Sequence, residues 1–148
     1  MTMGALAVVE EWLAAVNGGN RQRLQQLSTE DVEIIGPRGS AYGRQVLAEW
    51  MDRAGFSAEA LRWFCGADGN VVVEQDARWS DPASRAELGR ARVASHFAVS
   101  GGAVSRYQRH DGLAAALASA MLTMADEAEH RPRDPLVPAR ILLPANGA

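Results

Sequence analysis

The fold is decided by residues 5–39, which read ALAVVEEWLAAVNGGNRQRLQQLSTEDVEIIGPRG. Apolar side chains recur at helical spacing over 5–17, and two glycines then end that helix because glycine takes positive φ at low cost. Asn20 is placed to cap a short second helix, over about 21–27, by accepting a free backbone N–H group. A strand over 32–35 follows and runs into a Pro-Arg-Gly turn.

The rest of the chain is predicted as a third helix, an antiparallel meander and a closing helix. Turn signals at Asp68-Gly69-Asn70 and Gly101-Gly102 mark two of the hairpins. The helices are expected over 44–54 and 113–128, and the strands over 60–66, 71–80, 87–100 and 103–110. The fold class is therefore α+β, with a curved antiparallel sheet packed as a cone over three N-terminal helices, plus a C-terminal helix.

Length and composition limit what the chain does. Its 148 residues suit one domain, expected over 1–128, and 47% of them are apolar. The net charge of −3 lacks the basic excess of nucleic-acid-binding domains. No apolar run reaches the roughly 20 residues that span a bilayer, and the N-terminus has no basic region typical of a signal peptide. We expect neither nucleic acid nor membrane as a partner.

Cysteine, histidine and proline add three expectations. The single Cys65 cannot form an internal disulfide, which suits a reducing compartment and predicts a cytoplasmic protein. The three histidines are scattered, and no nucleotide-binding loop occurs, so neither a metal site nor a cofactor is expected. Residues 129–148 hold four of the six prolines and read as a flexible tail, or else as a segment that docks on the domain or a partner.

Alternation along the strands sorts the side chains of the meander into two faces. If Gly101-Gly102 is a two-residue loop, Ser95 pairs with Gln108, and across the preceding turn Gln75 pairs with Val93. One face is then mainly apolar and is expected to meet the helices. Its polar members are Gln75, Ser95, Arg106, Gln108 and His110.

The opposite face is mostly charged. Asp76 and Arg92 are placed on it as a cross-strand ion pair, and His96 and Tyr107 also lie there. This face is expected to meet water or a second subunit. A residue inserted in a strand would move the side chains that follow it to the opposite face and so reverse that part of the assignment.

The open end of such a cone is a natural ligand site. The predicted ligand-binding residues combine aromatic walls with a few polar groups: Trp12, Trp50, Gln75, Trp79, Ser95, Arg106 and Gln108. The alternative is that each tryptophan, Trp63 included, only fills the core.

Several segments of the chain resemble the nuclear transport factor 2-like (NTF2-like) superfamily, which includes ketosteroid isomerases and the SnoaL-like polyketide cyclases. The resemblance is carried by four stretches, namely 8–20, 36–39, the hairpin of 95–97 with 104–107, and 111–117. It implies a cone-shaped α+β barrel and frequent dimers, so a homodimer is expected. Functions within this superfamily differ widely, so the fold alone does not settle the activity.

The chain departs from the isomerases at each catalytic position. By the resemblance, the catalytic base falls on Gly36, the tyrosine on Trp12 and the second aspartate on Ser95. Loss of a general base costs on the order of 10²–10⁴ in rate. Steroid isomerisation by that set of residues is therefore not expected.

The resemblance implies two other catalytic arrangements. The SnoaL-like cyclases use a carboxylate with a nearby histidine, which implies His110, or His96, with Asp111 as candidates. Of these, only His110 is expected to point inward, as a general acid or base or else as a hydrogen-bonded wall residue. Limonene-epoxide-hydrolase-like members use two aspartates bridged by an arginine. Asp76, Arg78 and Arg92 supply those residue types, but their place on the charged face favours a solvated ladder of ion pairs.

We therefore expect a small-molecule-binding protein with an apolar pocket for a ring-type ligand. The alternative is an isomerase, cyclase or hydrolase that acts on a polyketide- or steroid-like compound through His110. A third interpretation is an interaction module that dimerises through the charged face and docks partners through its tail.

Overall fold

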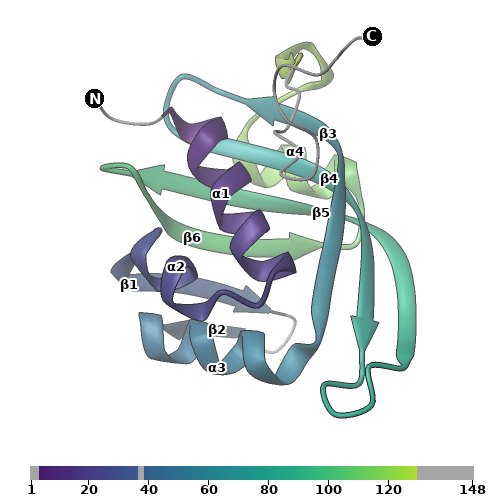
Figure 1. Ribbon diagram of the computed structural model, residues 1–148. Helices are drawn as coiled ribbons and strands as arrows, with labels where there is room; N and C mark the ends of the chain where they lie inside the picture. Colours follow the sequence, from purple (N-terminus) through teal and green to yellow (C-terminus); the bar gives the residue numbers. More distant parts are fainter. Residues whose placement is uncertain (1–3, 37–38, 130–148) are drawn as a thin grey trace, which may run out of the picture.

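Residues 4–36 and 39–129 are described by the computed structural model, and they form the predicted α+β fold (Figure 1). The helices are α1 (Ala5–Asn17), α2 (Arg21–Gln26), α3 (Arg44–Ala54), α4 (Leu113–Ala120) and a short 3₁₀ helix, η1 (Met124–Asp126). The strands are β1 (Ser28–Gly36), β2 (Gly39–Tyr42), β3 (Phe56–Cys65), β4 (Asn70–Ser80), β5 (Glu87–Ser100), β6 (Ala103–His110) and β7 (Glu127–Ala128).

The three N-terminal helices lie on the concave face of one curved sheet (Figure 1). Apolar residues recur along one side of α1, and that side is buried against the sheet. Asn20 caps α2 as predicted, because its side chain accepts the backbone N–H of Arg23 at 3.1 Å. The core between helices and sheet holds Trp12, Leu24 and Leu47 without exposed surface.

The strand order is β2-β1-β6-β5-β4-β3-β7. Strands β3 to β6 form the predicted antiparallel meander, and the pairs Gln75–Val93 and Asp76–Arg92 occur as expected. The predicted curved sheet is present, and β1, which runs parallel to β6, makes it mixed and not antiparallel throughout. The segment that pairs with β1 is β6, the last strand of the meander, and such a long connection permits a parallel pair. Among the described residues the sheet does not close on itself.

One extra residue in β6 changes which of its side chains face the core. Val99 pairs with Val104 and Ala98 with Arg106, which leaves Ser105 as the inserted residue of a β-bulge. The Ser105 hydroxyl donates to the Ala98 carbonyl at 3.2 Å and so ties the bulge to β5.

The bulge overturns the predicted register of this hairpin. Ser95 lies opposite Arg109 and not opposite Gln108. Tyr107 lies opposite Phe97, and both are buried in the core on the concave side. The face prediction was therefore wrong for the alternate residues of β6, since the convex side carries Arg106, Gln108 and His110.

The closing helix covers part of the convex face. Ala116 and Leu117 of α4 form a small second core with Phe64, Val72 and Ala94 of the sheet. The helix ends at Ala120 and not at residue 128.

The early end of α4 has a backbone cause. Met121 takes a left-handed conformation with φ of 58°, and its N–H donates to the Ala118 carbonyl. The chain then turns into η1 and adds β7 beside β3, where Ala128 pairs with Trp63.

The start of β3 is held by the end of α1. The Asn17 side chain donates to the Ala58 carbonyl and accepts from the Ala58 N–H, each at 2.9 Å. An amide that bonds both backbone groups of one residue replaces a neighbouring strand, so it covers the sheet edge there. The strand consequently begins at Phe56, earlier than the predicted residue 60.

The prediction of a proline-rich flexible tail over 129–148 lies outside the described residues, apart from Glu129. Within the described part of the chain, every helix is too short or too polar to cross a bilayer.

Gly55 is expected to be sensitive to any side chain. It has φ of 56°, and an added Cβ would overlap the carbonyl oxygen of Ser80. Gly55→Ala should lower the free energy of unfolding by about 2–4 kcal/mol, because left-handed strain and overpacking add. Urea unfolding measures this. Gly36→Ala is the matched control, since a Cβ at Gly36 meets nothing within 4 Å. Equal stability of both variants would contradict the account.

Candidate functional site

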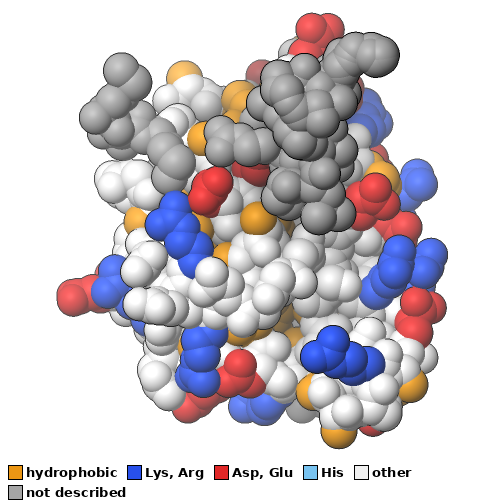
Figure 2. All heavy atoms as spheres, in the orientation of Figure 1, with side chains coloured by type: hydrophobic (Ala, Val, Ile, Leu, Met, Phe, Trp, Pro, Cys, Tyr) orange, Lys and Arg blue, Asp and Glu red, His pale blue; other side chains and the backbone are white. Residues whose placement is uncertain are grey.

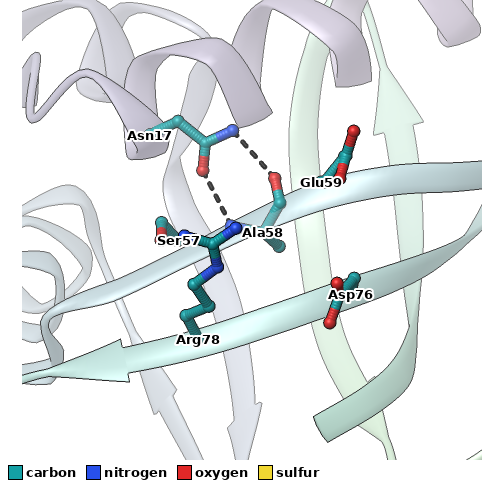
Figure 3. A pocket seen from close by; sticks show the side chains of 6 residues that line it. All are labelled: Asn17, Ser57, Ala58, Glu59, Asp76 and Arg78. Atoms are coloured by element: carbon teal, nitrogen blue, oxygen red, sulfur yellow. Dashed lines mark hydrogen bonds between the residues drawn. The ribbon is translucent and has the colours of Figure 1, made fainter. Parts of the chain in front are cut away.

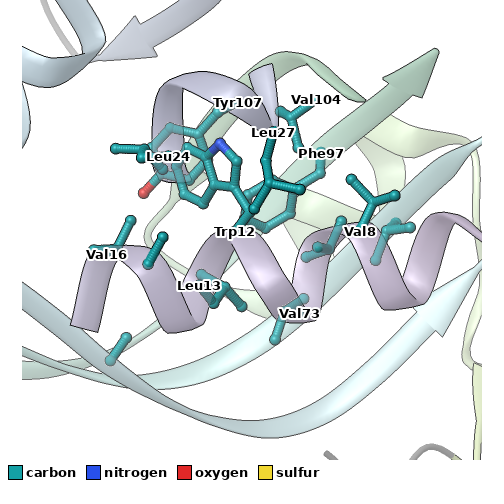
Figure 4. Close-up of a cluster of buried hydrophobic side chains, with 14 of the residues drawn as sticks. Val8, Trp12, Leu13, Val16, Leu24, Leu27, Val73, Phe97, Val104 and Tyr107 are labelled. Atoms are coloured by element: carbon teal, nitrogen blue, oxygen red, sulfur yellow. The ribbon is translucent and has the colours of Figure 1, made fainter. Parts of the chain in front are cut away.

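Six aromatic side chains form a continuous line of contacts across the concave face. The ring centroids are 5.2 Å apart for Phe97–Trp12, 5.0 Å for Trp12–Tyr107, 5.8 Å for Tyr107–Trp50, 5.8 Å for Trp50–Phe56 and 5.6 Å for Phe56–Trp79. Figure 4 shows the deep end of this line, where the Trp12 ring lies beside Phe97 and Tyr107. Trp50 and Trp79, at the other end, are only half-buried. Three of the predicted site residues therefore lie on one line.

The indole of Trp12 has its hydrogen bond within the protein. Its Nε1–H donates to the Ser28 hydroxyl at 3.0 Å, and that hydroxyl donates to the Leu24 carbonyl at 2.8 Å. Trp12 has no exposed surface. It joins α1 to the start of β1, so its role here is structural.

A neutral polar cluster lies in the floor of the concave face, made of Gln75, Ser95 and Tyr107. The Ser95 hydroxyl donates to Gln75 Oε1 at 2.6 Å, and Ser95 also hydrogen-bonds Tyr107. Gln75 and Ser95 have no exposed surface, and Tyr107 has 3%. The structure thus brings together the predicted Gln75 and Ser95 and adds a tyrosine that sequence reasoning placed on the opposite face.

Burial raises the pKa of the Tyr107 hydroxyl, and its hydrogen bond with Ser95 and the charge of Arg109 only oppose that rise. Tyr107 therefore stays protonated at neutral pH and can donate a hydrogen bond.

Arg109 takes the place on the concave side that was predicted for its neighbours. Its guanidinium carbon lies 5.0 Å from the centre of the Trp79 ring, a cation–π distance. Because Arg109 pairs with Ser95, its side chain is on the same face as the polar cluster. A positive charge therefore lies beside the half-buried end of the aromatic line.

His110 and Arg106 lie on the convex side. Arg106 is 3.6 Å from the Glu33 carboxylate, and Glu33 also accepts a hydrogen bond from Tyr42 at 3.1 Å. Burial, and then the charge of Arg106, lower the pKa of His110. The prediction that His110 points inward was wrong, because the bulge at Ser105 turned it outward.

The buried His96 side chain links the sheet to α4 through contacts of both ring nitrogens. Its Nδ1 is 3.0 Å from the Ser119 hydroxyl and its Nε2 is 2.7 Å from Asn70 Oδ1. Only 3% of His96 is exposed. The prediction that it lies at the surface of the charged face was therefore wrong. Burial, assisted by Arg106, lowers its pKa to about 4.

A hollow of about 410 Å³ opens where the half-buried end of the aromatic line reaches the surface. Val16, Met51 and Phe56 form its apolar wall, and the charged groups around it include Asp52 and Arg85. Phe56 contacts both Trp50 and Trp79. The hollow is thus connected by side-chain contacts to Tyr107 and the polar cluster.

A second hollow, also about 410 Å³, lies at the edge of the sheet beside Asn17 (Figure 3). Glu59, Asp76 and Arg78 line it. Although Asp76 and Arg92 are in register, no N–O distance within 4 Å joins them among the described residues, so the expected ion pair is not formed. The lining of both hollows is more polar than apolar, and of the two only the first is lined by an aromatic side chain, that of Phe56.

The described residues contain no group of three or more His, Cys, Asp or Glu side chains that could hold a metal ion. Gly36, to which the resemblance assigns the position of the isomerases' base, is exposed at the end of β1 and pairs with Gly39.

Solved structures with a similar architecture are known. An NTF2-like protein of unknown function from Cytophaga hutchinsonii aligns with a TM-score of 0.63 and 13% identity, over 76% of this chain and 93% of its own. A protein proposed to be a polyketide cyclase, from Pseudomonas putida, aligns with a TM-score of 0.61 and 21% identity, over 76% of this chain and 94% of its own. The chain has an NTF2-like fold. A computationally designed 17-OHP binder shares it, with a TM-score of 0.62 and 14% identity, over 77% and 95%. No family model and no curated protein matches the sequence.

Sequence reasoning missed Tyr107, Arg109 and Phe56 as members of the site. A signal for Tyr107 was present, because Val104 and Tyr107 are both large and apolar but are three residues apart. Strict alternation cannot bury both, so one residue between them must be inserted. Phe56 was missed because β3 begins earlier than predicted.

The pKa of His96 gives the fold a pH dependence. Since the folded pKa of about 4 lies below the unfolded value of 6.5, the unfolded chain binds the proton more strongly. The stabilisation is complete above about pH 6.5 and is lost as the pH falls toward 4. We expect the free energy of unfolding to decrease by about 2 kcal/mol between pH 7.5 and 5.

Urea unfolding at these two pH values measures the effect. His96→Gln should flatten the dependence, whereas His110→Gln, the control at a half-buried histidine, should leave most of it. An unchanged slope in His96→Gln would show that other groups cause it.

Proposed function

We propose that the protein binds a small, largely apolar ring compound on the concave side of its sheet, entering from the hollow beside Phe56. The observation that carries the proposal is the pair of half-buried tryptophans, Trp50 and Trp79, in contact with the wall of that hollow. Flat aromatic walls with few polar groups are typical of pockets for ring compounds.

The polar groups of the buried concave cluster favour binding over acid–base catalysis. The concave cluster offers hydroxyl, amide and guanidinium groups, from Ser95, Tyr107, Gln75 and Arg109. General acids and bases at neutral pH are most often histidine or a carboxylate. His110, the predicted catalytic residue, lies on the convex side. An isomerase, cyclase or hydrolase of polyketide- or steroid-like compounds is therefore the second candidate only.

The NTF2-like fold supports the proposal by analogy. The designed 17-OHP binder shows that this architecture can hold a small molecule. We continue to propose a cytoplasmic location, which the free Cys65 thiol suits.

A native mass spectrum of the purified protein, followed by calorimetric titration with ring compounds, tests the binding proposal. Trp79→Ala should weaken binding about 10- to 100-fold, because it removes aromatic area from the pocket and the partner of Arg109. Leu88→Ala is the control, since Leu88 is 71% exposed. Equal affinities of the two variants would place the ligand elsewhere.

We further propose that the protein is a homodimer that pairs through the convex face. This face carries adjacent acidic and basic side chains in register, namely Glu59, Asp76, Arg78 and Arg92. None of the four forms an ion pair within the described chain. A second copy, related by a two-fold axis, can place acidic groups against basic ones. Figure 2 shows that both signs are also interspersed on the face drawn there.

Light scattering coupled to size exclusion tests the dimer. Arg92→Glu should shift the dimer toward monomer by at least about tenfold in dissociation constant, because a rim charge pair becomes a repulsion. Arg53→Glu, on the exposed side of α3, is the control. A wild-type protein that stays monomeric at all concentrations overturns this proposal.

A further inference from the structure

The hollow beside Phe56 is bordered on one side by the turn that joins β4 to β5 (Figure 1). Asp81, Pro82 and Arg85 of this turn line the hollow. The turn is closed by its own backbone, because the Asp81 N–H donates to the Ala86 carbonyl at 2.8 Å and the Arg85 N–H donates to the Asp81 carbonyl at 2.7 Å. Arg85 is therefore held at the rim of the hollow by a hydrogen-bonded turn.

Arg85 takes a backbone conformation that favours glycine. Its φ is 64°, in the left-handed region, where side chains other than those of Asn and Asp are uncommon. In the described part of the chain, Met121 is the only other residue besides glycine with a positive φ. Strain of this kind is concentrated at positions that bind ligands. Since glycine would make the turn without strain, we look for the reason for an arginine in its guanidinium group.

The charged groups that line the hollow differ in whether the protein provides them with a partner. Asp52 is paired with Arg21 at 2.9 Å. Both carboxylate oxygens of Asp81 accept hydrogen bonds from within the turn, at 3.0 and 3.1 Å. By contrast, no ion pair or side-chain hydrogen bond joins Arg85 to any described residue. The guanidinium is thus the charge at this hollow that a bound molecule can neutralise.

The rest of the lining suits a ligand with an apolar body and an acidic end. Met51 and Phe56 belong to the apolar wall, against which a ring can pack. Ser57 and Ser80 also line the hollow, and their hydroxyls have no partner among the described residues. A guanidinium presents parallel N–H groups that match the two oxygens of a carboxylate. Arg85 therefore has the geometry to bind a carboxylate in a bidentate manner.

We propose that the hollow binds a ring carboxylic acid, with its carboxylate on the Arg85 guanidinium and its ring against Met51 and Phe56. This inference rests on the proposed function, since it adds an acidic group to the same ring compound. A singly charged acid fits better than a phosphate dianion, because the carboxylates of Asp52 and Asp81 also line the hollow. Hydrogen bonds from the turn lower the pKa of Asp81, so its negative charge persists at neutral pH.

Three naphthalene compounds substituted at the same ring carbon test the inference: naphthoate, naphthamide and naphthyl phosphate. Calorimetry with the full chain at low salt should give an affinity for naphthoate about five- to tenfold above that for naphthamide, the range between an exposed ion pair and a bidentate one. Added salt should reduce this ratio by screening. Arg85→Gln should abolish it, whereas Arg53→Gln, at an exposed arginine of α3 that does not line the hollow, should leave it unchanged.

Arg85→Gly separates a binding role from a structural one. Glycine adopts a φ of 64° without strain, so this variant should lose the preference for naphthoate while its melting temperature stays at or above that of the wild type. An arginine that only supports the turn would give the reverse result, a lower melting temperature with the preference retained, and that result would contradict the inference.

The remaining outcomes distinguish this inference from the proposed function. Equal affinity of the wild type for naphthoate and naphthamide overturns the acid inference but leaves the binding pocket intact. The chain has a net charge of −3, which repels anions in general, so a preference for naphthoate has a local cause. A preference for naphthyl phosphate contradicts the choice of a singly charged acid. Failure of all three compounds to bind overturns the proposed function itself.

Discussion

The inserted Ser105 in β6 is the constraint on which the concave side depends. With it, Tyr107 joins Trp12 and Phe97 in the core, at ring distances of 5.0 and 5.2 Å. Without it, strict alternation would bury Arg106 in place of Tyr107, and an unpaired buried charge costs far more than a bulge. The hydroxyl of Ser105 holds the bulge by bonding the neighbouring strand. One residue thus decides the chemistry of both faces.

The two faces consequently carry different chemistry. The concave side has a neutral chain of hydrogen bonds that ends at Gln75, bordered by aromatic rings and one cation–π contact. The convex side has the ionisable groups, including His110 and the Glu33–Arg106 pair, and is partly covered by α4. The buried interior of the concave side would favour an uncharged group over a charged one, because burial of a charge there would be costly.

Helix ends and glycines fix the parts around the hollow. Asn17, at the end of α1, bonds both backbone groups of Ala58 and so sets where β3 begins. Gly55 allows β3 to start against Ser80 at a place where no Cβ fits. Phe56 follows directly and forms the wall between the hollow and the tryptophans. The local backbone therefore positions the hollow, and the aromatic packing positions the side chains behind it.

The sequence by itself determined the α+β class, the boundaries of α1 and α3, and the meander, because helical periodicity and glycine turns are local signals. It also placed Gln75, Trp79 and Ser95 on one face of the sheet. Only the tertiary structure decided that β1 runs parallel to β6, that His96 is covered by α4, and that Tyr107 replaces its neighbours in the core. These features depend on contacts between segments far apart in the chain, which alternation along a single strand does not encode.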